Sequence, residues 1–307
     1  MLFRSTLFFS ADDSSSGWEL WKSDGTEAGT VRVKDIRPGN DSSAPGYLTN
    51  VNGTLFFSAD DSSSGGELWK SDGTEAGTVR VRDVNPGTGS SSPADLTEVN
   101  GMLFFSADGG ISQVELWKSD GTKAGTVRVK AINPDSGSYP YELANVNGTL
   151  FFNADDGSSG RELWKSDGTE AGTVRVRDIN AGPGSSSPYY LTNVNGTLFF
   201  SADDASSYSG KELWKSDGTE AGTVRVKDIY PGHDTSHPYW LTNVNGTLFF
   251  IADDGSSGRE LWKSDGTAAG TVRVRDIYPG PGTSSPDWLT NVNGTLFFRA
   301  RDRKSVG

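Results

Sequence analysis

Short runs of apolar residues alternate with polar turn residues along the whole chain, and residues 47–84 show the pattern most clearly. Asn52-Gly53 separates two β-prone runs, and this dipeptide is typical of a type I′ hairpin turn because both turn residues need a positive φ. The Leu-Phe-Phe run after it is apolar on both faces, whereas the last run alternates Val with Arg and so has one buried face. The pattern predicts four antiparallel strands, at residues 47–51, 54–59, 67–71 and 78–84.

This four-strand pattern recurs, because the string Glu-Leu-Trp-Lys-Ser-Asp-Gly-Thr occurs six times at steps of 48, 48, 47, 50 and 48 residues. A period of this length indicates a repeat architecture. Four-stranded units that repeat radially are typical of β-propellers, which protect their sheet edges by closing a ring. We therefore predict an all-β chain that forms a six-bladed β-propeller of four-stranded antiparallel blades. A β-solenoid is the competing architecture.

The two ends of the sequence bear on how such a ring closes. Residues 6–9 already match the second strand of a repeat, and residues 289–292 and 295–298 add a further first and second strand. We expect the ring to close by strand exchange between the N- and C-terminal segments, giving one domain over residues 1–300 and a disordered tail at 301–307. One Leu-Phe-Phe copy is then surplus. It either hangs free, displaces the copy at residues 7–9, or joins two chains into a homodimer through Leu296, Phe297 and Phe298.

Composition excludes several classes of partner. The formal net charge of −12 disfavours nucleic acid and anionic membrane surfaces, both of which need basic patches. No apolar run approaches the roughly 20 residues of a membrane span, and residues 1–10 turn polar too soon for a signal peptide. The absence of Cys removes disulfides and thiolate metal sites. We expect no cofactor, with calcium as the one exception considered below.

The extended string Glu-Leu-Trp-Lys-Ser-Asp-Gly-Thr-Glu-Ala-Gly-Thr resembles the bacterial ELWxxDGT repeat proteins, also described as hyalin-like, over all six units. The resemblance implies a large, secreted or surface-associated bacterial protein without a general activity. The Ser-Asp-Gly-Thr turn is also similar to the Asp-box of sialidase-type propellers. It departs from that box in its compressed spacing and in lacking the trailing aromatic residue.

Residues present in every repeat are interpreted as structural. An Asp at a turn start accepts backbone hydrogen bonds, and the Gly after it supplies the positive φ. The Trp is expected to pack between blades, and Glu67 and its equivalents are expected on the Trp face, paired with Arg or Lys. We therefore predict no catalytic residue. The structural set comprises Trp21, Trp69, Trp117, Trp164, Trp214 and Trp262 with Asp24, Asp72, Asp120, Asp167, Asp217 and Asp265.

Acidic loops between the second and third strands are candidates for a hard cation such as Ca²⁺, which prefers several carboxylate and carbonyl oxygens in a flexible loop. The order of residues differs from known calcium loops, so caps for strand ends are the alternative reading. The candidate ligands are Asp12, Asp13, Asp60, Asp61, Asp155, Asp156, Asp203, Asp204, Asp253 and Asp254.

Loops at one end of each blade vary between repeats, whereas the turns at the other end hardly do. Residues just before the first strand of each repeat include several aromatics, which suit the apolar faces of a sugar or peptide. We predict a non-catalytic binding or scaffold module that uses this variable face. The alternatives are a chain without an evolved ligand and a sialidase-like or lyase-like enzyme. The only histidines, His233 and His237, are expected to be solvated. The candidate ligand-binding residues, placed at a channel mouth, are Tyr47, Tyr141, Tyr189, Tyr190, Tyr239, Trp240 and Trp288.

Overall fold

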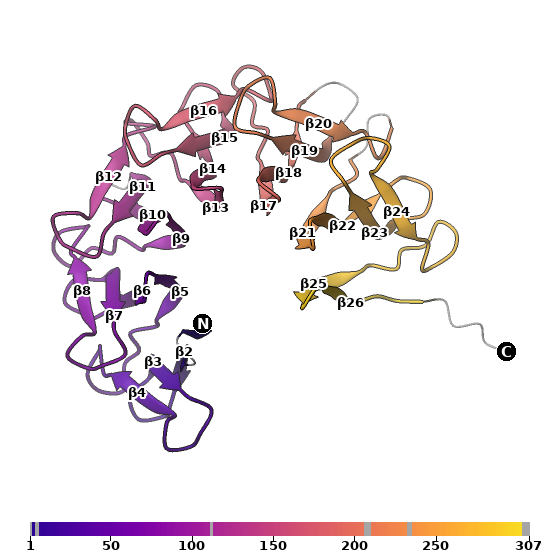
Figure 1. The fold of residues 1–307 in the computed structure, drawn as a ribbon. Helices are drawn as coiled ribbons and strands as arrows, with labels where there is room; N and C mark the ends of the chain where they lie inside the picture. Colours follow the sequence, from indigo (N-terminus) through magenta and orange to yellow (C-terminus); the bar gives the residue numbers. More distant parts are fainter. Residues whose placement is uncertain (1, 4–5, 111–112, 206–209, 232–234, 303–307) are drawn as a thin grey trace. The chain divides into compact units, whose positions relative to one another are not determined.

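A computed structural model describes residues 2–3, 6–110, 113–205, 210–231 and 235–302 (Figure 1). The chain divides into two compact units, which are treated separately. The first comprises Met1–Gly148 with Gly168–Thr173, and the second comprises Thr149–Asp167 with Val174–Gly307. Most of the tail predicted at residues 301–307 and all of His233 lie outside the described residues.

All regular structure in the described residues is β-strand, and no helix is present that is long and apolar enough to cross a membrane. Strands of the first unit are β1 (Leu2–Phe3), β2 (Thr6–Asp12), β3 (Trp18–Ser23), β4 (Val31–Lys34), β5 (Gly46–Val51), β6 (Thr54–Asp60), β7 (Gly66–Ser71), β8 (Val79–Arg82), β9 (Ala94–Val99), β10 (Met102–Asp108), β11 (Val114–Ser119), β12 (Val127–Lys130) and β13 (Tyr141–Val146). Strands of the second unit are β14 (Thr149–Asp155), β15 (Arg161–Ser166), β16 (Val174–Arg177), β17 (Tyr189–Val194), β18 (Thr197–Asp203), β19 (Lys211–Ser216), β20 (Val224–Lys227), β21 (Tyr239–Val244), β22 (Thr247–Asp253), β23 (Arg259–Ser264), β24 (Val272–Arg275), β25 (Asp287–Val292) and β26 (Thr295–Arg299).

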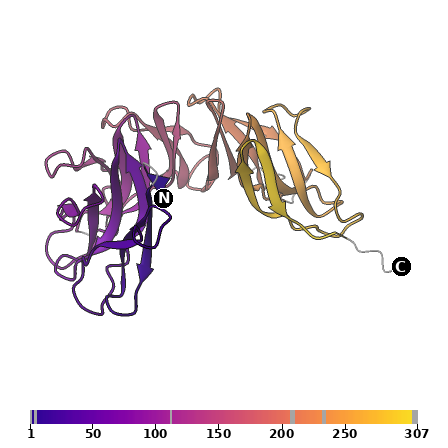
Figure 2. The same cartoon turned by 60° about the horizontal axis from the view of Figure 1, so that its bottom comes forward.

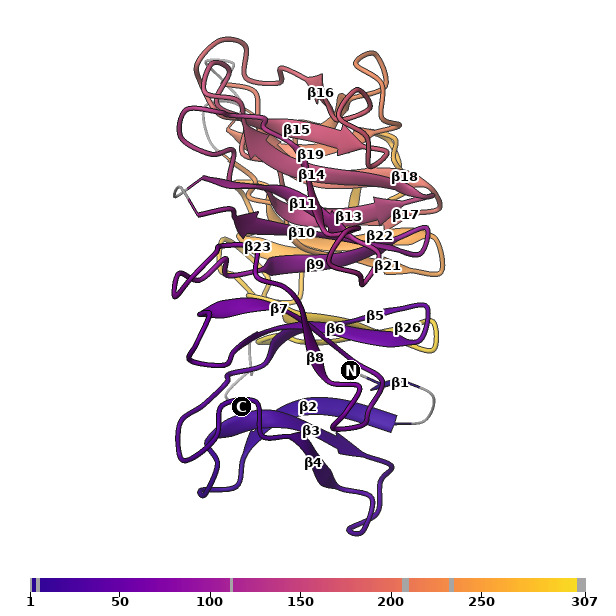
Figure 3. The ribbon, with the colours of Figure 1, turned by 90° about the vertical axis from the view of Figure 1, so that its left-hand side faces the viewer.

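The predicted four-stranded antiparallel unit is confirmed, but the described strands form seven sheets rather than six. Six sheets have four strands in chain order, from β1–β2–β3–β4 to β21–β22–β23–β24, and the seventh contains only β25 and β26. Figure 3 shows the first three sheets of the first unit following one another in chain order, and Figure 2 shows the same for the last sheets of the second unit. The first strands of neighbouring sheets lie side by side, as with β5 and β9 or β17 and β21.

Closure by strand exchange is not confirmed. In the described residues β2 pairs with β1 and β3, so the short N-terminal strand takes the place that a C-terminal strand was predicted to fill. β25 pairs with β26 alone. The surplus Leu-Phe-Phe copy therefore forms the second strand of a separate two-stranded sheet.

Burial follows the predicted gradient in the second sheet. Leu55, Phe56 and Phe57 in β6 are buried on both faces, whereas β8 buries Val81 and exposes Val79. Trp69 of the second sheet packs with Leu20 and other residues of the first sheet, and Trp117 and Trp262 pack in the same way against the sheets before them. Each of these three Trp side chains thus fills the space between two sheets.

The repeated turn also joins neighbouring sheets. Asp72 Oδ1 accepts hydrogen bonds from the backbone N–H and the hydroxyl of Thr74, at 2.9 and 2.7 Å, which closes the turn locally. Lys70 Nζ donates to the carbonyl of Gly121, which is the turn glycine of the next sheet, at 2.8 Å. The same Lys-to-glycine hydrogen bond recurs from Lys22, Lys118, Lys165 and Lys215.

The first strands β5, β9, β17, β21 and β25 each contain a bulge at the second residue. The register of β17 with β18 shifts between Tyr189 and Thr192, and Tyr190 has a φ of 59°. This left-handed conformation is uncommon for residues other than glycine and costs about 1–2 kcal/mol. The variable residues, placed just before the strand from sequence, thus lie inside it, and the bulge redirects their side chains. Equivalent positions are Tyr47, Asp95, Glu142, Tyr190, Trp240 and Trp288, with φ values of 53–59°.

Candidate functional site

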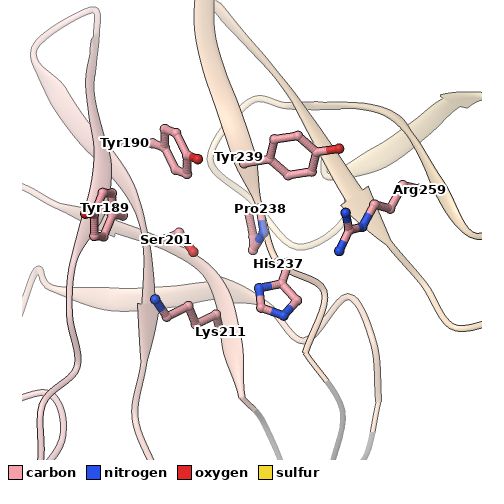
Figure 4. A pocket seen from close by; sticks show the side chains of 8 residues that line it. All are labelled: Tyr189, Tyr190, Ser201, Lys211, His237, Pro238, Tyr239 and Arg259. Atoms are coloured by element: carbon pink, nitrogen blue, oxygen red, sulfur yellow. The ribbon is translucent and has the colours of Figure 1, made fainter. Parts of the chain in front are cut away.

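Three of the seven predicted ligand-binding residues line one pocket in the second unit. Tyr189 and Tyr190 begin β17, Tyr239 begins β21, and the cavity that they share has a volume of about 480 Å³. This volume falls within the range of roughly 300–1,000 Å³ that is common for small-ligand sites. The full lining, drawn in Figure 4, is Tyr189, Tyr190, Ser201, Lys211, His237, Pro238, Tyr239 and Arg259.

The other four predicted residues are not part of the lining of this cavity. Trp240 and Trp288 contact each other, with ring centroids 5.7 Å apart, and do not line the pocket. Tyr47 and Tyr141 belong to the first unit, and Tyr47 is one of its exposed aromatic residues. Within the second unit, the structure thus gathers three of the five predicted residues around one cavity.

Two basic side chains complete the pocket. Lys211 Nζ lies 5.6 Å from the ring centroid of Tyr189, and Arg259 Cζ lies 5.7 Å from that of Tyr239. Figure 4 shows the two on opposite sides of His237. Such cation–aromatic contacts hold a positive charge over an aromatic face. Each cation is thus placed beside an aromatic wall of the cavity.

Neither basic side chain is paired with an acid in the described residues, because no carboxylate oxygen lies within 4.0 Å of Lys211 or Arg259. Asp203 is the cross-strand partner of Lys211, and Asp253 is that of Arg259. Both aspartates instead accept backbone N–H groups of their own loops, from Ala205 and Gly255 at 2.8 Å. The two cations are therefore available to an anion from outside, in a chain whose net charge is −12.

A buried glutamate holds the loop that carries His237. Glu212 accepts hydrogen bonds from the N–H of Ile229 at 2.9 Å and from the N–H and hydroxyl of Ser236 at 3.0 and 2.7 Å. Next to it, the N–H of His237 donates to the carbonyl of Lys211 at 3.2 Å. Glu67 makes equivalent bonds with Val84 and Ser91. The expected pairing of these glutamates with Arg or Lys is corrected: they bind backbone and serine donors.

The environment of His237 favours the neutral imidazole. Burial lowers the pKa of His237 below its usual 6.5, and the charges of Arg259 and Lys211 lower it further, while Asp253 opposes this. Burial also raises the pKa of Tyr239, which receives a hydrogen bond from Arg259. In the described residues no hydrogen bond joins Ser201 to His237. Ser201 and His237 are therefore not joined as a nucleophile and its base in the described structure.

The acidic loops are bonded internally. Asp61 Oδ1 accepts from the N–H and hydroxyl groups of Ser63 and Ser64, and Asp61 Oδ2 lies 3.2 Å from Arg80. Asp60 accepts the N–H of Ser62. In the loop of β14–β15, burial raises the pKa of Asp156, but hydrogen bonds from Ser158 and Ser159 outweigh it and lower the value to about 2. Asp204 lies 3.7 Å from Arg225. Hydrogen bonds from the loop recur at Asp12, Asp13, Asp155, Asp203, Asp253 and Asp254.

These bonds fit the alternative reading of the acidic loops, in which the carboxylates cap the loop. Within the described part of the chain, no three His, Cys, Asp or Glu side chains come together in a group that could hold a metal ion. The predicted calcium site therefore has no support from side-chain geometry.

Sequence reasoning missed the basic residues of the pocket. Lys211 and Arg259 occupy the position before Glu-Leu-Trp, where the first three repeats have Trp18, Gly66 and Val114. A change from uncharged to basic residues at one repeat position was a readable signal. The sequence alone does not show that these basic residues lie near the tyrosines, because this depends on the sheet register, which brings the start of the third strand beside the start of the first.

Comparison with known proteins first defines the class. Repeated four-stranded antiparallel sheets, together with the solved structures that they resemble, define a β-propeller-like fold. No family model and no curated protein sequence matches the chain. Similar solved structures include the β-propeller domain of the Trilobed protease from Pyrococcus furiosus, at 10% identity over 97% of this chain and 88% of that one, with a TM-score of 0.47.

Two further structures are more similar by TM-score. A prolyl endopeptidase is 12% identical over 99% of this chain and 50% of its own, with a TM-score of 0.57. A puromycin-hydrolyzing peptidase of Mycobacterium tuberculosis is 11% identical over 96% of this chain and 49% of its own, with a TM-score of 0.50. The chain thus spans about half the length of these two peptidases. This similarity to peptidases contradicts the predicted function, a non-catalytic binding or scaffold module, because the matched proteins are enzymes that include such a fold.

Proposed function

We propose that the chain is the substrate-handling propeller of a peptide hydrolase, and that its pocket holds the C-terminal carboxylate of a peptide. The observation that carries this proposal is the presence of two cations, Lys211 and Arg259, that line a tyrosine-walled cavity without a carboxylate partner. The peptidases of similar fold support the choice of peptide as the ligand class.

The chemistry of the pocket suits a carboxylate that is attached to an apolar side chain. Arg and Lys donate charge-assisted hydrogen bonds to carboxylate oxygens, and these are stronger than neutral ones. The rings of Tyr189, Tyr190 and Tyr239 offer apolar faces to the last side chain of the peptide. A peptide with a free C-terminus and an apolar last residue uses both features together.

The test compares two pentapeptides that end in Phe, one with a free carboxylate and one with a C-terminal amide, by calorimetry with the full chain. The free acid is expected to bind at least tenfold more tightly, since one charge-assisted hydrogen bond contributes about 1.5–3 kcal/mol. Equal affinity for acid and amide, or no binding of either, would refute the carboxylate site.

Substitutions that introduce the residue found at the same position of another repeat are expected to remove the charge and preserve the fold. Lys211→Val installs the residue that the third repeat has as Val114, and Arg259→Val does the same in β23. Each is expected to weaken binding of the free acid about tenfold or more. Arg161→Val, at the same repeat position outside the pocket, is the matched control and is expected to leave the affinity unchanged.

In this proposal the peptide bond is cut by a catalytic domain other than this chain. Incubating the chain alone with the free-acid peptide, followed by mass spectrometry, is expected to return the intact peptide. Appearance of cleaved products that depend on His237 would assign the hydrolysis to this pocket and overturn that division of roles.

A further inference from the structure

The third repeat has an arginine without an acidic partner. Arg128, the second residue of β12, forms no ion pair with a described residue, and its side chain is exposed. The equivalent arginine of every other repeat is half-buried and paired with an aspartate of the loop between the second and third strands. These pairs are Arg32 with Asp13, Arg80 with Asp61, Arg175 with Asp156, Arg225 with Asp204, and Arg273 with Asp254.

Two substitutions in the third repeat remove both acids that surround this arginine elsewhere. In the fourth repeat, Arg175 lies 3.5 Å from Asp156 and 3.7 Å from Asp178. The third repeat has Gly109 and Ala131 at these two positions, which are aspartates in all the other repeats. The loop residues 111–112, which lie outside the described part of the chain, are Ile and Ser and carry no charge.

The buried acid of this repeat does not replace them. Glu115 accepts hydrogen bonds from the N–H groups of Ile132 and Asn133, both at 3.1 Å, and from the hydroxyl of Ser138 at 2.5 Å. Its carboxylate therefore holds the loop after β12, as the equivalent glutamates do in the other repeats.

The unpaired guanidinium lines a cavity. The cavity has a volume of about 270 Å³, and Gly109, Gln113, Trp117 and Arg128 line it. Arg128 is the cross-strand partner of Trp117, so the two side chains stand next to each other on one face of the sheet. A Cβ atom on Gly109 would lie 3.2 Å from Cζ2 of Trp117, so the glycine keeps the space beside the ring open.

We propose that this cavity binds the carboxylate of an acidic side chain from another molecule, with Arg128 as the principal donor. A guanidinium presents a planar set of N–H groups that matches the two oxygens of a carboxylate. The other repeats favour a carboxylate over a larger oxyanion such as phosphate, because there an aspartate side chain occupies the same position beside the arginine.

Charge in the third repeat also favours an anion. Lys123 stands where the second repeat has Glu75, so this repeat has lost acids at three positions. Repulsion of an incoming carboxylate is therefore weaker here than in the rest of an acidic chain. The inference does not depend on the proposed peptide site, because that pocket lies in the second unit and Arg128 lies in the first.

The test titrates the full chain with two blocked tripeptides, acetyl-Gly-Asp-Gly-amide and acetyl-Gly-Asn-Gly-amide, and follows the Arg128 Nε–H and Trp117 indole N–H signals by NMR. Blocked ends remove the terminal carboxylate that the peptide site of the second unit would hold. The Asp peptide is expected to shift both signals saturably and to bind at least about fivefold more tightly than the Asn peptide.

Arg128→Gln removes the charge and is expected to abolish the preference for Asp over Asn. Arg80→Gln is the matched control, because Arg80 occupies the same position of the second repeat but is paired with Asp61. It is expected to leave the affinity at Trp117 unchanged. The double variant Gly109→Asp with Ala131→Asp restores both acids and is expected to abolish binding while Arg128 is still present.

A transfer experiment checks the same reasoning in the opposite direction. Asp61→Gly with Asp83→Ala gives the second repeat the residues of the third, and the Trp69 indole N–H is then expected to shift with the Asp peptide. Equal affinity for the Asp and Asn peptides, or Asp binding that survives Arg128→Gln, would overturn the proposal. A blocked phosphoserine tripeptide that binds where the Asp peptide does not would also overturn it, since the site would then select phosphate.

Discussion

Removing the carboxylate of Glu212 is expected to destabilise the second unit and loosen the pocket together. Glu212→Ala deletes the acceptor of three buried donors, namely the N–H of Ile229 and both the N–H and the hydroxyl of Ser236. These donors lie 17 and 24 residues after Glu212, so the side chain closes the whole loop that leads to His237.

The magnitude follows from what each donor does next. A buried N–H that loses its partner costs about 1–3 kcal/mol. The Ser236 hydroxyl has a second acceptor, the carbonyl of Lys211 at 3.4 Å, so its loss counts little. Two orphaned N–H groups, reduced by the relief of carboxylate burial, give an expected loss of about 2–4 kcal/mol in the free energy of unfolding.

The assay combines urea unfolding with hydrogen exchange at single amides. The amides of Ile229 and Ser236 are expected to exchange faster in the variant, and affinity for the free-acid pentapeptide is expected to fall. Glu67→Ala is the matched control, because Glu67 makes the same bonds with Val84 and Ser91 in the first unit. It is expected to cost a similar free energy without changing peptide affinity. Unchanged exchange at Ile229 in Glu212→Ala would refute the role assigned to the carboxylate.

Three further predictions concern stability. Burial raises the pKa of Glu212 from 4.5 to about 7, so between these pH values the folded chain holds a proton that the unfolded chain has released. The free energy of unfolding is therefore expected to fall as pH rises through this window, and to fall less steeply in Glu212→Gln, as measured by thermal melts across pH. Tyr47→Gly is expected to raise the free energy of unfolding by about 1 kcal/mol relative to Tyr47→Ala, because the φ of 55° suits glycine; equal stabilities would contradict this. Lys70→Met is expected to cost about 1.5–3 kcal/mol through loss of its hydrogen bond to the next sheet, whereas Lys263→Met, which has no such bond in the described residues, should cost under about 0.5 kcal/mol in the same urea titration.

The strands were predictable because each is marked by local chemistry. Asn52-Gly53 adopts the two positive φ values, 47° and 90°, that its turn requires, and the Leu-Phe-Phe run is buried on both faces as its pattern indicates. The seventh sheet was not predicted, because the pairing of β1 with β2 depends on two residues, Leu2 and Phe3, with no pattern of their own.

The pocket was predictable only in part. Tyr189 and Tyr239 were found because aromatic residues at variable loop positions are informative without a structure. Lys211 and Arg259 were not predicted, because their place in the pocket depends on which strands have their first residues close together in the sheet. A salt bridge was predicted for Glu212 because the sequence shows charged residues nearby. The sequence does not show that the backbone N–H of Ser236, 24 residues later, lies beside this carboxylate.

The hydrogen bond from each repeat lysine to the next turn glycine has a consequence for how such a chain can change. Because the joining groups are the same at five successive sheet boundaries, any repeat presents the neighbour before it and the neighbour after it with matching surfaces. Exchanging two whole repeats would keep every joint while altering which loops become adjacent. The pocket exists because the repeat with Lys211 precedes the repeat with Tyr239 and Arg259. Recombination at the level of whole repeats can therefore generate new pockets from old loops without redesigning the packing between sheets.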